Sequence, residues 1–188
     1  MAEAPPYPYH LGTVYPVMPV PPVPEHCVPV EAGAVRLVVE ARDLLDEAAR
    51  SRGGVAPPPE QSSQFNDFGA SLHVCAASDG LEHLRFDCFD HEPHYHYIRN
   101  AEAANVIVRL DDVAEGDPIE WTIARLRARL PEMLDHAGAA ELAEEVRSDP
   151  TAVASALDRV RALLVEAGQR ALARRTSGQE LAPARSVP

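Results

Sequence analysis

The chain has 188 residues, 46% of them apolar, and its 17 basic and 29 acidic residues give a net charge of −12. The apolar fraction excludes a wholly disordered chain. The acidic balance argues against a nucleic-acid or anionic-membrane partner, and no apolar run approaches the ~20 residues of a transmembrane helix. Every basic residue is arginine, which favours a high-GC bacterial source. The N-terminus shows no signal-peptide pattern, so a cytoplasmic location is expected.

Residues 1–30 contain nine prolines and are predicted to form an extended, polyproline-like arm. The arm also carries several valines, which need apolar surface. Either it wraps its own domain or it embraces a partner subunit, with a disordered tail as the third alternative. Residues 31–175 are expected to form a single domain, and residues 176–188 a disordered tail.

A helix is predicted over residues 31–52, because apolar residues recur there at i+3 and i+4 spacing. The residues of this stripe are Val35, Val38, Ala41, Leu45 and Ala48. Gly53-Gly54 is expected to end the helix, and the prolines and polar residues of 55–68 indicate a loop.

Between residues 70 and 111 the apolar period changes to two, which indicates strands. Residues 70–77 and 81–89 form a predicted hairpin around Ser78-Asp79-Gly80, followed by strands at 94–98 and 105–110. A three-residue loop is favoured because it separates apolar from polar side chains onto opposite faces. The resulting pairs are Val74 with Leu84, Leu72 with Phe86, His73 with Arg85, Ser71 with Asp87, and Cys75 with His83.

Residues 117–175 are predicted to be helical. Asp117-Pro118 with Glu120 is typical of a helix start, and Pro131 predicts a kink or break. A short helix over 139–148 and a second cap at Asp149-Pro150 follow. The predicted fold class is therefore α+β: a four-stranded antiparallel β-meander with helices packed on one face.

Five of the eight histidines fall between residues 73 and 96. His94 and His96 are two apart, so a strand places both rings on one face, near enough to share a metal ion. A tight return after Phe89 is expected to bring His96 opposite Asp87 and His94 opposite Phe89. One face of the sheet would then carry His73, His83, Arg85, Asp87, His94 and His96.

Two histidines and one carboxylate bind Fe(II), Mn(II) or Zn(II) and leave positions open for substrate or water. His94 and His96 are the expected first ligands, and the candidates for the third are His91, Glu92, Asp87 and His73. Arg85 is a candidate for holding a substrate carboxylate. Tyr95 and Tyr97 are candidates for donating a proton or shaping the pocket wall.

Residues 84–98, which read LRFDCFDHEPHYHYI, resemble a segment of small uncharacterised proteins of high-GC actinobacteria. The resemblance extends over residues 65–135. That group has no known activity, so the resemblance implies a bacterial, cytoplasmic setting and no reaction.

These patterns predict a His-cluster metal-binding protein, a small metal-dependent enzyme acting on a small polar or carboxylate substrate. The alternative is a non-catalytic accessory or assembly subunit that docks on a larger partner through its Pro-rich arm and His/Tyr sheet face. A pH-responsive interface is a third hypothesis, because clustered imidazoles titrate near neutrality. A homo-oligomer is compatible with each, and a metal-free polar surface or simple packing also explains such a cluster.

Overall fold

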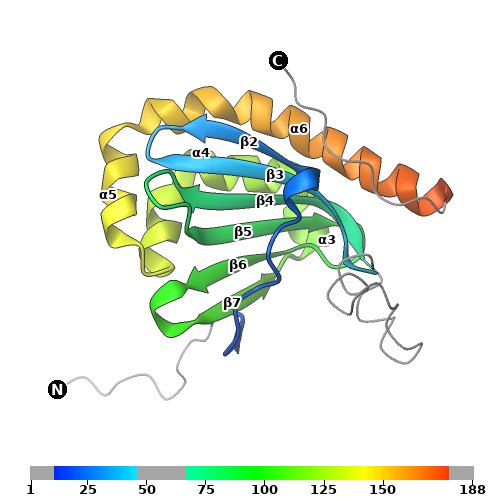
Figure 1. Ribbon diagram of the computed structural model, residues 1–188, viewed down its shortest axis with the longest axis horizontal. Coiled ribbons are helices and arrows are strands. Elements are labelled where there is room, and N and C mark those ends of the chain that lie inside the picture. The colour runs from blue at the N-terminus through cyan, green and yellow to red at the C-terminus, as the bar shows by residue number, and fades with distance from the viewer. Residues whose placement is uncertain (1–10, 46–66, 178–188) are drawn as a thin grey trace.

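The structure is a computed structural model that describes residues 11–45 and 67–177. Its centre is a seven-stranded antiparallel sheet with the strand order β1-β7-β6-β5-β4-β3-β2 (Figure 1). The strands are β1 (Thr13–Tyr15), β2 (Cys27–Ala32), β3 (Val35–Asp43), β4 (Phe68–Ala76), β5 (Glu82–Phe89), β6 (His94–Arg99) and β7 (Ala104–Arg109). The helices are η1 (Pro24–His26), η3 (Asn100–Glu102), α3 (Asp112–Glu115), α4 (Pro118–His136), α5 (Ala140–Ser148) and α6 (Pro150–Ser177).

The predicted four-stranded meander is wrong, although the α+β class holds. Its four strands correspond to β4–β7, and β1, β2 and β3 extend the sheet. Residues 31–43, expected to be helical, form the end of β2, a turn and β3. The i+3/i+4 pattern leaves out Leu37 and Val39. Every second residue is buried against the helices, as in a strand: Val35, Leu37, Val39 and Ala41.

The turn between β2 and β3 depends on Gly33, whose φ of +69° is a conformation that side-chain-bearing residues rarely adopt. A Cβ there would also lie 2.8 Å from the Ala152 Cβ of α6. Leu44 and Leu45 are helical as predicted. Residues 46–52 of the predicted helix, the Gly53-Gly54 stop and most of the 55–68 loop lie outside the described residues. So do residues 1–10 and 178–188.

The β4–β5 hairpin has the predicted register over most of its length. Val74 pairs with Leu84, Leu72 with Phe86 and His73 with Arg85. Gly80 in the turn has φ +77°, a left-handed conformation that favours glycine. Ala76 N donates to Leu81 O, so the loop spans residues 77–80 and is one residue longer than predicted. A bulge follows Val74, so Cys75 pairs with Glu82 and not with His83. The predicted Cys75–His83 pair is therefore wrong.

The helices cover one face of the sheet, with α6 against β2–β4 and α4 against β5 (Figure 1). The predicted helix starts are confirmed, since Asp117 Oδ1 accepts a hydrogen bond from the Glu120 N–H and Asp149 Oδ1 accepts one from the Ala152 N–H. α4 continues through Pro131, where a break was possible. None of the helices in the described part of the chain is long and apolar enough to cross a membrane.

The Pro-rich segment 16–26 crosses the other face of the sheet, because β1 and β2 occupy opposite edges (Figure 1). Six strand spacings amount to about 29 Å. Residues 16–23 in extended form and the 3-10 helix η1 together reach roughly 32 Å, which is enough to span them. Three hydrogen bonds fasten the segment: Asn105 Nδ2 to Val17 O, Arg85 Nη1 to Val20 O, and Val23 N to Glu40 Oε1.

These attachment points recur every three residues along the arm and every second strand across the sheet, on β7, β5 and β3. Three residues of polyproline II advance about 9.3 Å, and two strand spacings measure about 9.6 Å. The repeat of a proline-rich chain therefore matches the spacing of the strands beneath it. This match explains how residues 16–23, which belong to no helix or strand, are held at regular points.

Candidate metal centre

Strands β5 and β6 bring together Asp87, His94 and His96. Asp87 is paired directly with His94, and His96 lies two residues further along the same face, opposite Arg85. The predicted register, with His96 opposite Asp87, is wrong by two residues because the return after Phe89 is longer than a tight turn. A shift of two residues keeps each side chain on its face, so the cluster still forms.

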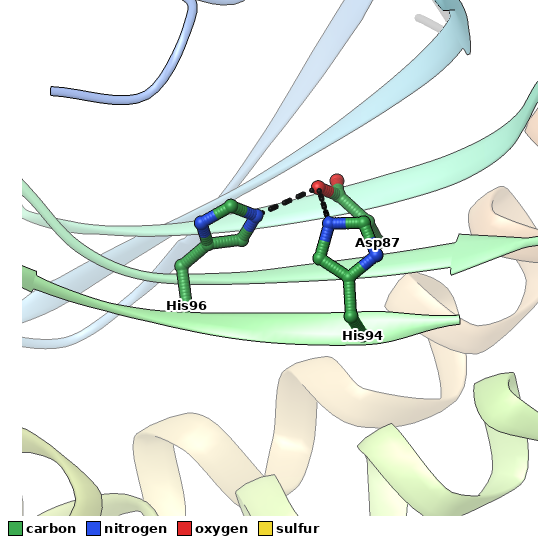
Figure 2. A group of neighbouring side chains, drawn as sticks. All are labelled: Asp87, His94 and His96. Atoms are coloured by element: carbon green, nitrogen blue, oxygen red, sulfur yellow. Dashed lines mark hydrogen bonds and ion pairs between the residues drawn. The ribbon is translucent and has the colours of Figure 1, made fainter. Parts of the chain in front are cut away.

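One oxygen of Asp87 faces both imidazoles (Figure 2). His96 Nε2 lies 3.1 Å and His94 Nε2 3.3 Å from Asp87 Oδ2. One ligand atom from each of the three residues lies within 4.8 Å of the others, a separation at which they can hold a metal ion. Asp87 and His96 are buried, and His94 is partly exposed. Within the described residues, this is the group of histidine, cysteine and carboxylate side chains that meets these criteria.

The outer nitrogen of each ring is held by a hydrogen-bond acceptor. His94 Nδ1 lies 2.7 Å from the backbone oxygen of Glu92, and His96 Nδ1 lies 3.0 Å from Asn105 Oδ1. Asn105 donates through Nδ2 to the Val17 carbonyl at 2.6 Å, which orients its amide with Oδ1 toward His96. Both Nδ1 atoms therefore carry hydrogen. Burial lowers the pKa of His94, but the hydrogen bond to Asp87 and its charge outweigh burial and raise that pKa. Each Nε2 faces Asp87 Oδ2, where it donates a proton or, once a metal ion displaces that proton, binds the ion.

The second oxygen of Asp87 is also occupied. Ser71 Oγ donates a hydrogen bond to Oδ1, and Arg42 Nη1 lies 3.6 Å from the same atom. Burial raises the pKa of Asp87, but the charge of Arg42 and the hydrogen bonds from His94 and His96 outweigh burial and hold that pKa well below its usual range. Asp87 is thus an ionised carboxylate whose Oδ2 is directed at the two rings.

A second polar cluster adjoins the first on the same face. His73 Nε2 lies 3.0 Å from Glu40 Oε2, and His73 Nδ1 lies 2.7 Å from Glu82 Oε1. Burial lowers the pKa of His73, but these two hydrogen bonds outweigh burial and the net pKa is raised. Since carboxylate oxygens only accept, both ring nitrogens donate and His73 is an imidazolium. It lies outside the Asp87–His94–His96 group.

Arg85 belongs to this second cluster. Its Nε and Nη2 donate to the two oxygens of Glu82, each at 2.8 Å, and its Nη1 donates to Val20 O at 2.9 Å. The Arg85 guanidinium, predicted to bind a substrate carboxylate, thus binds the Glu82 carboxylate and the backbone of the arm.

The side chains of two candidate ligands, His91 and Glu92, lie in the loop between β5 and β6 and outside the group. The His91 side chain is 61% exposed and lies 3.3 Å from Asp90 and 3.6 Å from Asp67. The Glu92 carboxylate accepts a hydrogen bond from Arg109 at 2.6 Å. The contribution of Glu92 to the site is its backbone oxygen, which orients His94.

Tyr95 and Tyr97 alternate with the histidines along β6 and so face the helices. They pair with Phe86 and Leu84 in the core, and the Tyr95 ring lies 5.3 Å from that of Trp121. Both tyrosines line a separate cavity of about 320 Å³ beside α4. The sheet therefore separates the tyrosine hydroxyls from the imidazoles.

His83 also leaves the expected face, because the bulge puts Glu82 in its place. His83 Nδ1 lies 3.4 Å from Asn100 Nδ2. Five described residues of the polar face are not among the site residues predicted from the sequence: Glu40, Arg42, Ser71, Glu82 and Asn105. Ser71 was placed opposite Asp87 but given no role, and Glu40 and Arg42 fell in the segment read as a helix. The only signal for Asn105 was its place in the alternation of a predicted strand.

A cavity of about 260 Å³ opens beside the three residues, between the arm and the sheet. Asp87, His94 and His96 line it together with Arg42 and Arg85. The remaining walls are mainly apolar and come from the arm, from Leu44 and from the sheet positions Phe89 and Ile107. The group therefore has access to a small space with polar and apolar sides.

Comparison with known proteins assigns the chain to a family. The family model described as "Domain of unknown function (DUF7700)" matches residues 29–164, which is most of the chain. The chain belongs to the DUF7700 family. No curated protein and no solved structure matches it. The matched DUF7700 region includes Asp87, His94, His96 and Asn105, whereas residues 11–28 of the arm precede it.

Proposed function

We propose that this DUF7700 protein binds one divalent transition metal ion through Asp87, His94 and His96 and works as a small metal-dependent enzyme. Its substrate is a small polar or carboxylate-bearing molecule that reaches the ion from the cavity under the arm. The observation that carries the proposal is the convergence of two imidazole Nε2 atoms on a single carboxylate oxygen.

Two Nε2 atoms that face one carboxylate oxygen are held there either by protons, which they donate to it, or by a metal ion that all three atoms bind. A metal ion takes the place of those protons when it binds. The surrounding hydrogen bonds support the proposal, because each proposed ligand ring donates its other N–H to an oxygen, and Ser71 and Arg42 orient the second oxygen of the carboxylate.

Two histidines and one carboxylate leave coordination positions open on Fe(II), Mn(II) or Zn(II). An ion with open positions polarises a bound substrate or lowers the pKa of bound water. The chain's own groups bind and orient: Asn105 fixes the tautomer of His96, the Glu92 carbonyl fixes that of His94, and Ser71 holds Asp87. The arm shields one side of the cavity from bulk water.

The test is the metal content of the full-length protein purified from metal-replete cells, with calorimetric titration of Zn(II), Mn(II) and Fe(II) into the metal-free protein. We expect about one equivalent of transition metal per chain. The double variant His94→Ala/His96→Ala should lose it while keeping its circular dichroism spectrum.

The matched control is His83→Ala/His91→Ala, which also removes two of the five histidines between residues 73 and 96 but none of the three proposed ligands. It should retain one equivalent. Binding of no metal by the unmodified protein, or unchanged binding by His94→Ala/His96→Ala, would overturn the proposal and leave the three residues as a proton-sharing network.

A further inference from the structure

The cavity next to the proposed metal ion combines buried charge with a hydrocarbon wall. On its inner side are the three proposed ligands. On its outer side the arm contributes four consecutive residues to the lining: Val17, Met18, Pro19 and Val20. Phe89 and Ile107 add apolar surface from the sheet. A ligand in this cavity would therefore contact the metal ion at one end and apolar side chains at the other.

Apart from the two imidazoles proposed as ligands, the buried charges beneath the cavity balance. The buried carboxylates of Glu40, Glu82 and Asp87 face three cations, namely Arg42, Arg85 and the His73 imidazolium. His94 and His96 are neutral when they bind a metal ion, so a divalent ion adds two positive charges that these side chains do not neutralise. An uncompensated charge away from water is unfavourable, so the loaded site favours an anionic ligand.

The arm leaves hydrocarbon uncovered at the same place. Val17, Met18 and Val20 keep about half of their surface exposed although they line the cavity. Burying such surface against a ligand is favourable in proportion to the apolar area removed from water. At about 260 Å³ the cavity is below the roughly 300–1,000 Å³ of drug-sized sites, so its ligand is small.

We propose that the metal centre takes a small monocarboxylate with an apolar body, its carboxylate on the ion and its hydrocarbon against residues 17–20 of the arm. This inference rests on the proposed metal site and adds the chemical class of its ligand. The arm then acts as the specificity element, since it supplies most of the wall that the apolar body touches.

The experiment uses the full-length protein loaded with Co(II), whose visible absorption reports changes in coordination. Benzoate is the probe, acetate has the same charge without the apolar body, and benzamide has the same shape without the charge. We expect benzoate to change the Co(II) spectrum saturably and to bind at least tenfold more tightly than acetate. Benzamide should leave the spectrum unchanged over the same concentrations.

Two valines provide a matched pair of variants, because Val20 and Val14 are each 54% exposed and only Val20 lines the cavity. Val20→Asp should weaken benzoate binding at least tenfold at unchanged Co(II) content. Val14→Asp should leave benzoate binding unchanged.

The outcomes separate the two proposals. If the protein binds no Co(II), the metal site itself is refuted and the ligand class falls with it. If Co(II) binds but benzoate is no better than acetate, or benzamide is its equal, the metal site stands and the ligand class is overturned. Equal effects of Val20→Asp and Val14→Asp would overturn the role of the arm.

Discussion

Glu82 is the carboxylate on which two cations of the polar face converge, and its replacement by glutamine has a calculable effect. Burial raises the pKa of Glu82, but the hydrogen bonds from Arg85 and His73 outweigh burial and lower it from 4.5 to about 2. The side chain is only 17% exposed, so solvent screens these interactions little. One pKa unit corresponds to about 1.4 kcal/mol, so ionised Glu82 stabilises the fold by about 3 kcal/mol.

The sign follows from the direction of the shift. A lowered pKa stabilises the folded state fully above the unfolded value of 4.5, and this contribution is lost as the pH falls through about 2. We therefore expect Glu82→Gln to reduce the free energy of unfolding by about 3 kcal/mol at pH 7 and by less than half as much near pH 3. Urea denaturation followed by circular dichroism at a series of pH values measures this difference.

Glu102→Gln is the control, because the Glu102 carboxylate is 61% exposed and lies 3.4 Å from Arg99 at the surface. Exposed pairs contribute little, so this variant should stay within about 1 kcal/mol of the unmodified protein at every pH. A Glu82→Gln difference that stays constant between pH 7 and pH 3 would show that shape, and not charge, is responsible. A difference below about 1 kcal/mol at pH 7 would refute the buried ion pairing.

Three further predictions concern the metal site, the turn and the core. Asn105→Ala should weaken metal binding about 10–100-fold in a competition titration, because His96 loses the acceptor that fixes its tautomer. Asn100→Ala is the control and should leave metal binding unchanged, because the Asn100 side chain donates to the Glu82 carbonyl and contacts no proposed ligand. Gly33→Ala should lower the free energy of unfolding, measured by urea denaturation, by about 1 kcal/mol or more beyond the effect of Gly80→Ala. Both glycines have positive φ, but only the Cβ at position 33 would meet another residue, at 2.8 Å. Equal losses of stability would contradict the packing of α6 on this turn. Leu84→Ala, fully buried, should destabilise by roughly 2–5 kcal/mol in thermal or urea unfolding, whereas Leu172→Ala, 52% exposed, should change stability by less than about 0.5 kcal/mol.

The alternation of side chains along β4, β5 and β6 is predictable from the sequence alone. Apolar residues such as Leu72 and Phe86 had to share a face, and a strand places His94 and His96 on one side whatever its partner. Two of the three proposed ligands were therefore predictable as a pair. Asp87 was one of four candidates for the third, because the choice depended on a register that the turn after Phe89 sets.

The spacing of apolar residues does not distinguish a helix from a strand where the same sequence fits both patterns. The segment containing Val35 and Val38 satisfied a helical spacing, but its full set of valines and leucine fits a strand, and pairing with β4 decides between the two. The error also hid Glu40 and Arg42, which belong to the polar face only when β3 is a strand.

Sequence alone thus determined the local elements and the face that each side chain takes, because these follow from the repeat of the backbone over a few residues. Contacts between distant segments were decided by the tertiary structure. Asn105 meets Val17 across 88 positions, and Arg85 meets Val20 across 65. The arm could reach both only after the edges of the sheet were placed, since its path is the line between β1 and β2. The cavity under it, and with it the access to Asp87, His94 and His96, exists only because that path crosses the polar face.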